Sequence, residues 1–233
     1  MNYGDIEKQT FKTYLTFSTV LLIFLLAFFS VSSSVYRVNN IIYEEKEELN
    51  YSSIDKLKGT SIWLIDDTYF DSFYQENPTV EKISIKKELP TTLVVNIEIS
   101  EKIAYIEDLR RSPSNRYILY KNLFTSEVNK NERLMFVTIG NGPLNKGFKE
   151  EIVTFVMTLK KYSVNTSNIE LVYDGEVLKL THFDTAINLG RPSDLARKAA
   201  VVGYYLAEGV CDGEIRIVYS ENEADLTAIT NCN

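Results

Sequence analysis

The chain has 233 residues and a net charge of −7, with acidic and basic side chains interspersed along it. Because no basic stripe is present to neutralise phosphate groups, nucleic acid is excluded as a partner. The only histidine is His182, which excludes most zinc sites and every Ser-His-Asp triad built around another residue.

An uncharged segment close to the N-terminus predicts a membrane-spanning helix. No charged side chain occurs between Thr13 and Tyr36, and the stretch 14–31 is predominantly apolar. A helix of that length spans about 27 Å, close to the ~30 Å hydrocarbon core of a bilayer. Lys8 and Lys12 precede the segment and favour a cytoplasmic N-terminus. We therefore expect a cytoplasmic tail over 1–12 and a transmembrane helix over 13–34.

A cleaved signal peptide is the alternative interpretation, since Ser30, Ser32 and Ser34 supply small residues near a cleavage point. The apolar run is long for a signal peptide, and it lacks an Ala-x-Ala cleavage site. Under either interpretation, residues 37–233 lie outside the cytoplasm.

Residues 35–102 predict a small α+β domain. A first strand over 35–43 precedes a short helix that Ser52 or Ser53 caps and Gly59 ends, and a second short helix is expected over 67–74. Two alternating stretches, 80–87 and 92–100, flank a turn at Pro90 and predict a hairpin with one buried face. The expected fold is a three-stranded sheet covered by two helices.

Residues 103–229 predict a mixed β domain with two helices, followed by a short tail over 230–233. The first helix has one apolar face, and Ser193 and Gly209 are the expected cap and end of the second. The face of the first helix comprises Phe148, Ile152, Phe155, Val156 and Leu159. The second buries Leu195, Ala199, Val202 and Leu206. Strands are expected over 117–120, 135–139, 169–173, 177–181, 186–189, 215–220 and 224–229.

Two stretches of the sequence resemble the FtsQ/DivIB family of bacterial cell-division proteins. The segment 77–105 is similar to the end of that family's membrane-proximal POTRA domain, and 57–66 is similar to the link between its helices. The matching residues of the hairpin are Pro78, Val80, Ile83, Ile85, Pro90, Thr92, Leu93 and Glu101. The proline that usually follows the family's Glu-Arg pair is missing after Glu101-Lys102.

The second half also resembles the C-terminal β domain of this family. Residues 187–190, with Leu195 and Lys198, are similar to its "v-x-L-G … L-x-x-K" run, and 213–216 are similar to its "I-D-L-R" strand. The resemblance implies a divisome scaffold that is not an enzyme and holds no cofactor or metal. It implies a single-pass protein of the cell membrane, located at the division septum, whose POTRA domain helps recruitment to that site. Its expected partners are coiled-coil membrane proteins of the FtsB/DivIC and FtsL type, which dock at the C-terminal region by strand addition and link it to septal wall synthesis.

The last strands are the candidate partner-binding site, because an edge strand exposes backbone groups that can accept another strand. For the inward-facing members, a plain core role is the equally weighted alternative. The candidate residues are Ile215, Arg216, Ile217, Val218, Tyr219, Ala224 and Leu226.

Several residues that could suggest catalysis or metal binding have simpler interpretations. His182 and Asp184 lie at a strand end among polar residues, and Asp66 and Asp67 suit a helix cap or first turn better than a cation site. The two cysteines, Cys211 and Cys232, allow either one disulfide or two free thiols.

Two other functions are compatible with the sequence. A POTRA-containing component of a protein secretion or membrane-assembly system is the main alternative, although the chain is too short to add a transmembrane barrel of its own. A secreted hydrolase is disfavoured because no coherent pair of nucleophile and base is present.

Overall fold

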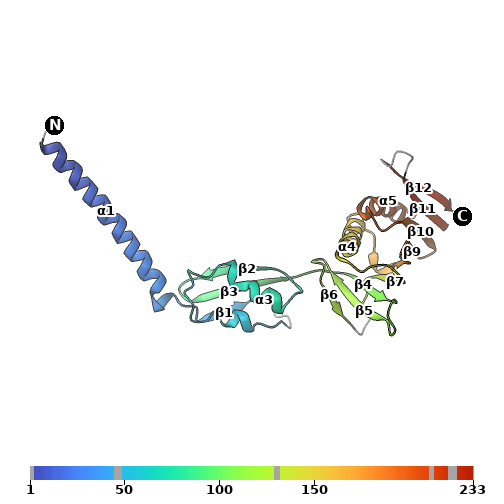
Figure 1. Cartoon of the computed structure of the whole chain (residues 1–233), viewed down its shortest axis with the longest axis horizontal. Coiled ribbons are helices and arrows are strands. Elements are labelled where there is room, and N and C mark those ends of the chain that lie inside the picture. The colour runs from blue at the N-terminus through green and yellow to red at the C-terminus, as the bar shows by residue number, and fades with distance from the viewer. Residues whose placement is uncertain (1–2, 45–48, 129–131, 210–212, 220–224, 233) are drawn as a thin grey trace. The chain divides into compact units, whose positions relative to one another are not determined.

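The computed structural model describes residues 3–44, 49–128, 132–209, 213–219 and 225–232, with the side chains of 3–11 and 30–32 left out (Figure 1). The chain is a mixed α+β protein that divides into two units, Met1–Ile99 and Ser100–Asn233.

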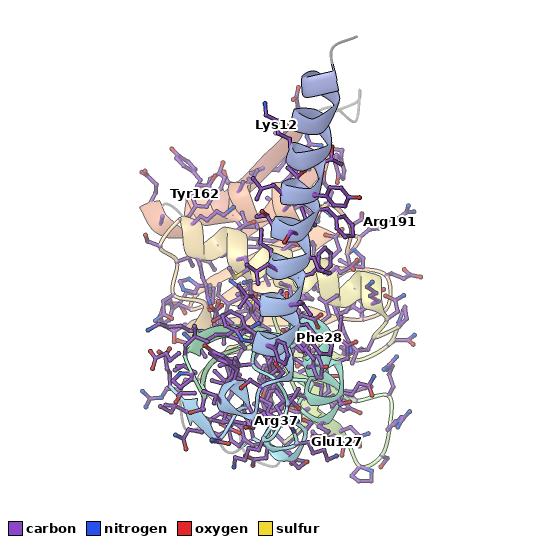
Figure 2. The ribbon with its side chains drawn as sticks, turned by 90° about the vertical axis from the view of Figure 1, so that its left-hand side faces the viewer. Lys12, Phe28, Arg37, Glu127, Tyr162 and Arg191 are labelled. Carbon is purple, nitrogen blue, oxygen red and sulfur yellow. The ribbon has the colours of Figure 1, made fainter. Side chains whose placement is uncertain are left out.

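Helix α1 (Tyr3–Ser32) begins the first unit. Its stretch Lys12–Phe29 is long and apolar enough to cross a membrane, and none of that stretch is buried in the protein. Figure 2 shows the side chains of this helix, with Lys12 and Phe28 labelled near the two ends of the stretch. The helix is compatible with a single-pass membrane protein, and it begins earlier than the predicted range of 13–34.

The rest of the first unit is a three-stranded sheet with short helices. Strand β3 (Thr92–Ile99) lies in the centre, parallel to β1 (Asn40–Tyr43) and antiparallel to β2 (Val80–Glu88). The helices are η1 (Ser34–Tyr36), α2 (Ser52–Asp55), η2 (Asp67–Phe70) and α3 (Asp71–Glu76). The predicted hairpin is therefore confirmed, whereas the first strand is shorter than predicted because 34–36 form a 3₁₀ turn.

One face of this sheet packs against the helices. The core joins three residues of β3 to apolar side chains of the connecting segments, as the alternation over 92–100 predicts. The buried cluster includes Val38, Ile54, Leu57, Ile62, Ile65, Phe70, Phe73, Val80, Leu93, Val95 and Ile97. Tyr51, rather than Ser52 or Ser53, occupies the cap position of α2 and makes no side-chain capping bond.

The second unit contains one large mixed sheet. Its described strands lie in the order β12-β11-β10-β9-β8-β7-β4-β5-β6. Their bounds are β4 (Lys102–Asp108), β5 (Asn115–Tyr120), β6 (Thr125–Glu127), β7 (Met135–Ile139), β8 (Ile169–Tyr173), β9 (Leu178–His182), β10 (Thr185–Gly190), β11 (Gly213–Tyr219) and β12 (Leu226–Cys232). Helix α4 (Lys146–Lys161) connects the parallel pair β7 and β8, and α5 (Leu195–Glu208) connects the parallel pair β10 and β11. The 3₁₀ turn η3 (Thr166–Asn168) precedes β8.

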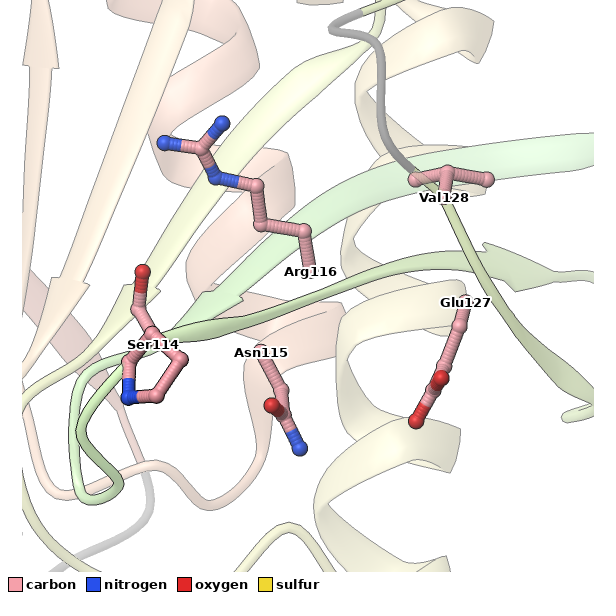
Figure 3. Close-up of a pocket in the computed structure, with 6 residues that line it drawn as sticks. Ser114, Asn115, Arg116, Glu127 and Val128 are labelled. Carbon is pink, nitrogen blue, oxygen red and sulfur yellow. The ribbon is translucent and has the colours of Figure 1, made fainter.

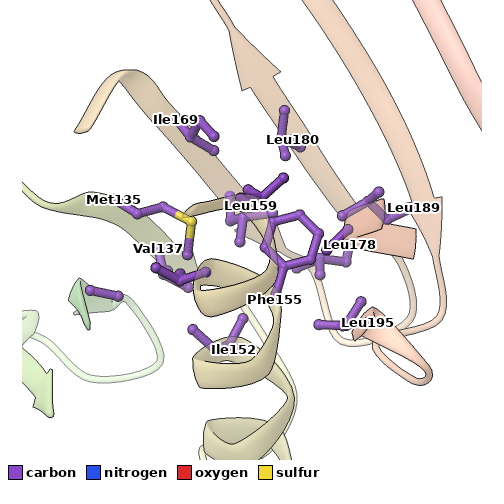
Figure 4. Packing of buried hydrophobic residues seen from close by; sticks show 14 of the residues in the cluster. Met135, Val137, Ile152, Phe155, Leu159, Ile169, Leu178, Leu180, Leu189 and Leu195 are labelled. Atoms are coloured by element: carbon purple, nitrogen blue, oxygen red, sulfur yellow. The ribbon is translucent and has the colours of Figure 1, made fainter. Parts of the chain in front are cut away.

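Helix α4 supplies much of the core of this unit. All five residues of its predicted apolar face are buried. Figure 4 shows Phe155 and Leu159 among aliphatic side chains of the strands, with Leu195 of α5 nearby. Asn145 begins the helix by accepting a hydrogen bond from the backbone N–H of Phe148 at 2.9 Å.

The start of α5 differs from the prediction. Asp194, with φ +56°, takes the cap position in place of Ser193 and makes no side-chain capping bond. Instead, Glu151 Oε2 of α4 accepts a hydrogen bond from the backbone N–H of Leu195 at 2.8 Å. The helix end is confirmed, since Gly209 has φ +62° and its N–H bonds Tyr205 O.

A buried carboxylate at the end of β4 accepts hydrogen bonds from a residue that follows the strand. Asp108 Oδ1 accepts hydrogen bonds from Arg110 Nε at 2.7 Å and from the Arg110 backbone N–H at 3.1 Å. Hydrogen bonding to Arg110 holds the pKa of the Asp108 carboxyl below its usual range, although burial opposes this effect. Because the folded-state pKa lies below the unfolded one, this stabilisation is present above about pH 4 and is lost as the pH falls through the folded-state value.

We expect Asp108→Asn to lower the free energy of unfolding by about 1–3 kcal/mol at neutral pH, because the buried bonds then lack their charged acceptor. Urea unfolding followed across the acidic range should show the difference from the original protein shrinking as the pH falls. Glu150→Gln is the matched control, since Glu150 pairs with Lys146 at an exposed position where ion pairs contribute little. A difference that is independent of pH would contradict the role assigned to Asp108.

Candidate functional site

Strand β12 forms one edge of the large sheet. It pairs in antiparallel fashion with β11, from Gly213↔Cys232 to Tyr219↔Leu226. Among the described residues, no strand pairs with its other side. An edge of this kind presents backbone donors and acceptors to which another chain can add a strand.

The predicted site residues divide between the core and the surface. Ile215 and Ile217 are only 1% and 5% exposed and belong to the core, so the core interpretation holds for both. Arg216 and Tyr219 are exposed, and Val218 is half-buried. Leu226 is partly buried and packs against the core. Ala224 lies outside the described residues.

Tyr219 is held in place by residues that begin α5. Its hydroxyl donates to Asp194 Oδ2 at 3.2 Å, and Lys198 Nζ lies 5.7 Å from the centre of its ring, within reach of a cation–π interaction. Arg197 also contacts Asp194 Oδ2, at 3.2 Å. Burial and the nearby Asp194 carboxylate raise the pKa of Tyr219. The ring is therefore fixed beside the β12 edge while its outer side stays open to solvent.

Lys198 is an unusual member of this group because it is almost fully buried. Its ammonium group donates to the backbone oxygen of Arg191 at 2.6 Å. Burial lowers the pKa of Lys198, and the carboxylates of Asp194 and Glu151 oppose that shift. A hollow of about 550 Å³ opens over these residues, lined by Leu189, Gly190, Arg191, Ser193, Asp194, Arg197, Lys198, Ile217 and Tyr219.

The opposite face of the β11–β12 pair exposes an apolar side chain that the sequence reasoning did not select. Ile229 is 57% exposed and lies opposite Arg216 in the register. A small hollow of about 150 Å³ beside it is lined by Glu214, Arg216, Ile229 and Asn231. The alternation of 226–232, with Leu226 and Ala228 turned toward the core, is the signal that could have placed Ile229 on the outer face.

A third hollow lies at the other end of the sheet. It has a volume of about 360 Å³ and is lined by Pro113, Ser114, Asn115, Arg116, Glu127 and Val128 (Figure 3). Arg116 Nε donates to Glu107 Oε1 at 3.1 Å. The lining of this hollow is mainly polar and offers little apolar surface to bury. The hollow is therefore a weaker candidate for a protein interface than the β12 edge.

The remaining sequence candidates have structural roles. The prediction of a capping role for Asp66 is confirmed, because its carboxylate accepts from the Thr68 backbone N–H at 3.0 Å. His182 ends β9 with its ring 4.5 Å from that of Phe183, and burial lowers its pKa. Cys232 is disulfide-bonded, and Cys211 lies outside the described residues. Among the residues that the structure describes, no His, Cys, Asp and Glu side chains gather into a metal-binding group.

No protein-family model matches the chain. A search of curated proteins likewise finds no match.

Proposed function

We propose that this protein is a membrane-anchored scaffold of the bacterial divisome, of the FtsQ/DivIB type. In this proposal α1 crosses the cell membrane with its N-terminus in the cytoplasm, and both folded units lie outside. The protein performs no bond chemistry. It binds coiled-coil single-span proteins of the FtsB/DivIC and FtsL type and links them to septal wall synthesis.

The N-terminal helix and a cysteine support the proposed location. The exposed apolar stretch Lys12–Phe29 has the length that a bilayer requires. Cys232 is disulfide-bonded, and such bonds persist mainly in oxidising environments outside the cytoplasm.

The first unit supports assignment as a POTRA domain. Its elements follow the order strand, helix, helix, strand, strand, and β3 lies between β1 and β2. This is the arrangement expected from the resemblance of 77–105 to that domain. In the proposal, this unit helps to recruit the protein to the division site.

The observation that carries the proposal is the β12 edge. Strand β12 has one side unoccupied by any described strand, carries the exposed Ile229, and pairs with β11, whose last residue is Tyr219; it therefore suits the addition of a partner strand. Backbone hydrogen bonds would supply affinity, and these two side chains would supply selectivity.

The test is the position of a fluorescent protein fused to the N-terminus in growing cells of the source organism. We expect a band at midcell late in the cell cycle. A fusion to residues 1–36 alone is the control, and it should spread over the membrane if the folded units direct localisation. An even distribution of the whole protein would overturn the divisome role and favour the secretion or assembly alternative.

A further inference from the structure

Four exposed apolar side chains lie near the point where the chain leaves α1. Val35, Trp63 and Leu64 are 58%, 43% and 53% exposed, and Leu89 is similarly open to solvent. We call these four residues the juxtamembrane patch. Large apolar side chains grouped at one end of a folded unit indicate a surface that another apolar phase covers.

Backbone hydrogen bonds bring residues 59–64 against the chain that follows α1. The N–H of Gly59, which has φ +86°, donates to Val38 O at 2.8 Å. The N–H of Ile62 donates to Tyr36 O at 2.8 Å, and the rings of Tyr36 and Trp63 lie 5.6 Å apart. Trp63 therefore lies beside Tyr36, the fourth residue after the end of the helix.

Leu89 belongs to the same end of the first unit. It lies in the turn between β2 and β3, and the N–H of Asn39 donates to Thr91 O at 2.9 Å in that turn. Strand β1 starts opposite Thr92 and runs parallel to β3. The far end of β3, near Glu98, is about 20 Å away at the usual rise per residue.

The length of the connection limits how far this end can lie from the membrane. Only four residues lead from Ser32, the last residue of α1, to Tyr36, and three of them form the 3₁₀ turn η1. Even fully extended, four residues reach about 14 Å, and about 8 Å at a 3₁₀ rise. Each headgroup layer is about 5–8 Å thick. When Ser32 lies at the edge of the hydrocarbon core, the 3₁₀ connection of about 8 Å therefore brings Tyr36, and Trp63 beside it, to the outer part of that layer.

The chemistry of the patch fits the bilayer interface rather than a protein groove. Tryptophan and tyrosine are the side chains that prefer the headgroup region, where an apolar ring and a polar atom are both accommodated. Exposed cations (Arg37 and Lys87) and exposed carboxylates (Asp66 and Glu88) are mixed in the segments that carry the patch, so the apolar side chains supply its affinity for the layer.

We propose that the juxtamembrane patch inserts into the headgroup layer of the bilayer and holds the first unit against the membrane surface. This inference rests on the proposed anchoring by α1 and is independent of the role in division. The surface that it assigns to lipid is then closed to protein partners.

The chain contains a single tryptophan, Trp63, so its own fluorescence tests the proposal. The full chain is reconstituted into phosphatidylcholine–phosphatidylglycerol vesicles that carry phosphatidylcholine brominated near the glycerol end of its acyl chain. The matched control is Trp63→Phe/Glu98→Trp, which moves the tryptophan to an exposed position at the far end of β3. We expect the bromolipid to quench Trp63 at least about twofold more strongly than the control tryptophan.

A second variant, Leu64→Glu, places a charge on an exposed position of the patch and should reduce the quenching of Trp63 towards the control value. Flotation of the vesicles after alkaline extraction reports separately whether α1 is embedded. Equal quenching of Trp63 and the control tryptophan with α1 embedded would overturn this inference alone. Failure of the protein to float would overturn the membrane anchor and this inference together.

Discussion

Replacing Ile229 with aspartate is expected to weaken capture of the proposed coiled-coil partners by at least about tenfold. An apolar side chain at the centre of an interface contributes about 2 kcal/mol or more, and a charge buried without a partner adds a further penalty. Ile229 is exposed in the structure, so the substitution leaves the core of the second unit intact. Co-purification with proteins of the FtsB/DivIC and FtsL type, co-expressed from the source organism, measures the effect.

Leu109→Asp is the matched control for this experiment. Leu109 is a similarly exposed apolar residue that follows β4, and β4 lies six strands from β12 in the sheet order, about 29 Å at the usual strand spacing. Binding should survive this change. Unchanged capture by Ile229→Asp, or equal loss in both variants, would remove the partner site from the β12 edge.

Charged substitutions at Tyr219 and Leu226, two of the candidate site residues, should also weaken capture. The structure ranks these variants. Tyr219 is exposed and bonded to Asp194, whereas Leu226 packs against the core. A charge at Leu226 would therefore destabilise the second unit as well as the interface, so Ile229 and Tyr219 are the cleaner positions.

Phe155→Ala is expected to destabilise the second unit by about 3–5 kcal/mol, because it leaves a cavity under the large sheet. Phe155 is fully buried among side chains of α4, the strands and α5. Urea unfolding followed by far-ultraviolet circular dichroism reports all helices of the chain, and α4 and α5 are the long helices of the second unit. Tryptophan fluorescence reports Trp63 in the first unit. The substitution should move the dichroism transition and leave the fluorescence transition in place.

Phe155→Leu is the conservative control and should cost less than about half as much, because it removes less volume. A loss below about 1 kcal/mol for Phe155→Ala would contradict its place in the core. Equal movement of both transitions would mean instead that the two units unfold as one.

The periodicity of apolar residues predicted the helices and strands that have one solvent-exposed face and one buried face. The apolar face of α4 and the hairpin of β2 and β3 are the clearest cases, since every third or fourth residue, or every second one, is apolar. Strand β4 had no such signal, because Ile103, Ala104, Tyr105 and Ile106 are all buried and the strand lies between β7 and β5. Strand β6 is three residues long, too short for any period.

The candidate site was only partly predictable for a related reason. Strand order depends on pairings between distant segments, such as β4 with β7 and β10 with β11, and no local pattern encodes them. Proximity to the C-terminus suggested β11 and β12 as an edge, yet it could not separate the buried Ile215 and Ile217 from Ile229. The contact between Tyr219 and Asp194 likewise joins residues brought together only by the crossover through α5.

The two sheets are joined through their internal strands. Strand β3 lies between β1 and β2, β4 lies between β7 and β5, and only Ser100 and Glu101 separate β3 from β4. In the proposed anchored state, a force between the membrane and the second unit enters the first unit through the edge strand β1 and leaves it through the end of β3. Because β1 and β3 are parallel, and the force acts on the start of β1 and on the end of β3, it loads the ladder between them in shear. The short β1–β3 ladder is therefore the part of the first unit that would carry such a load.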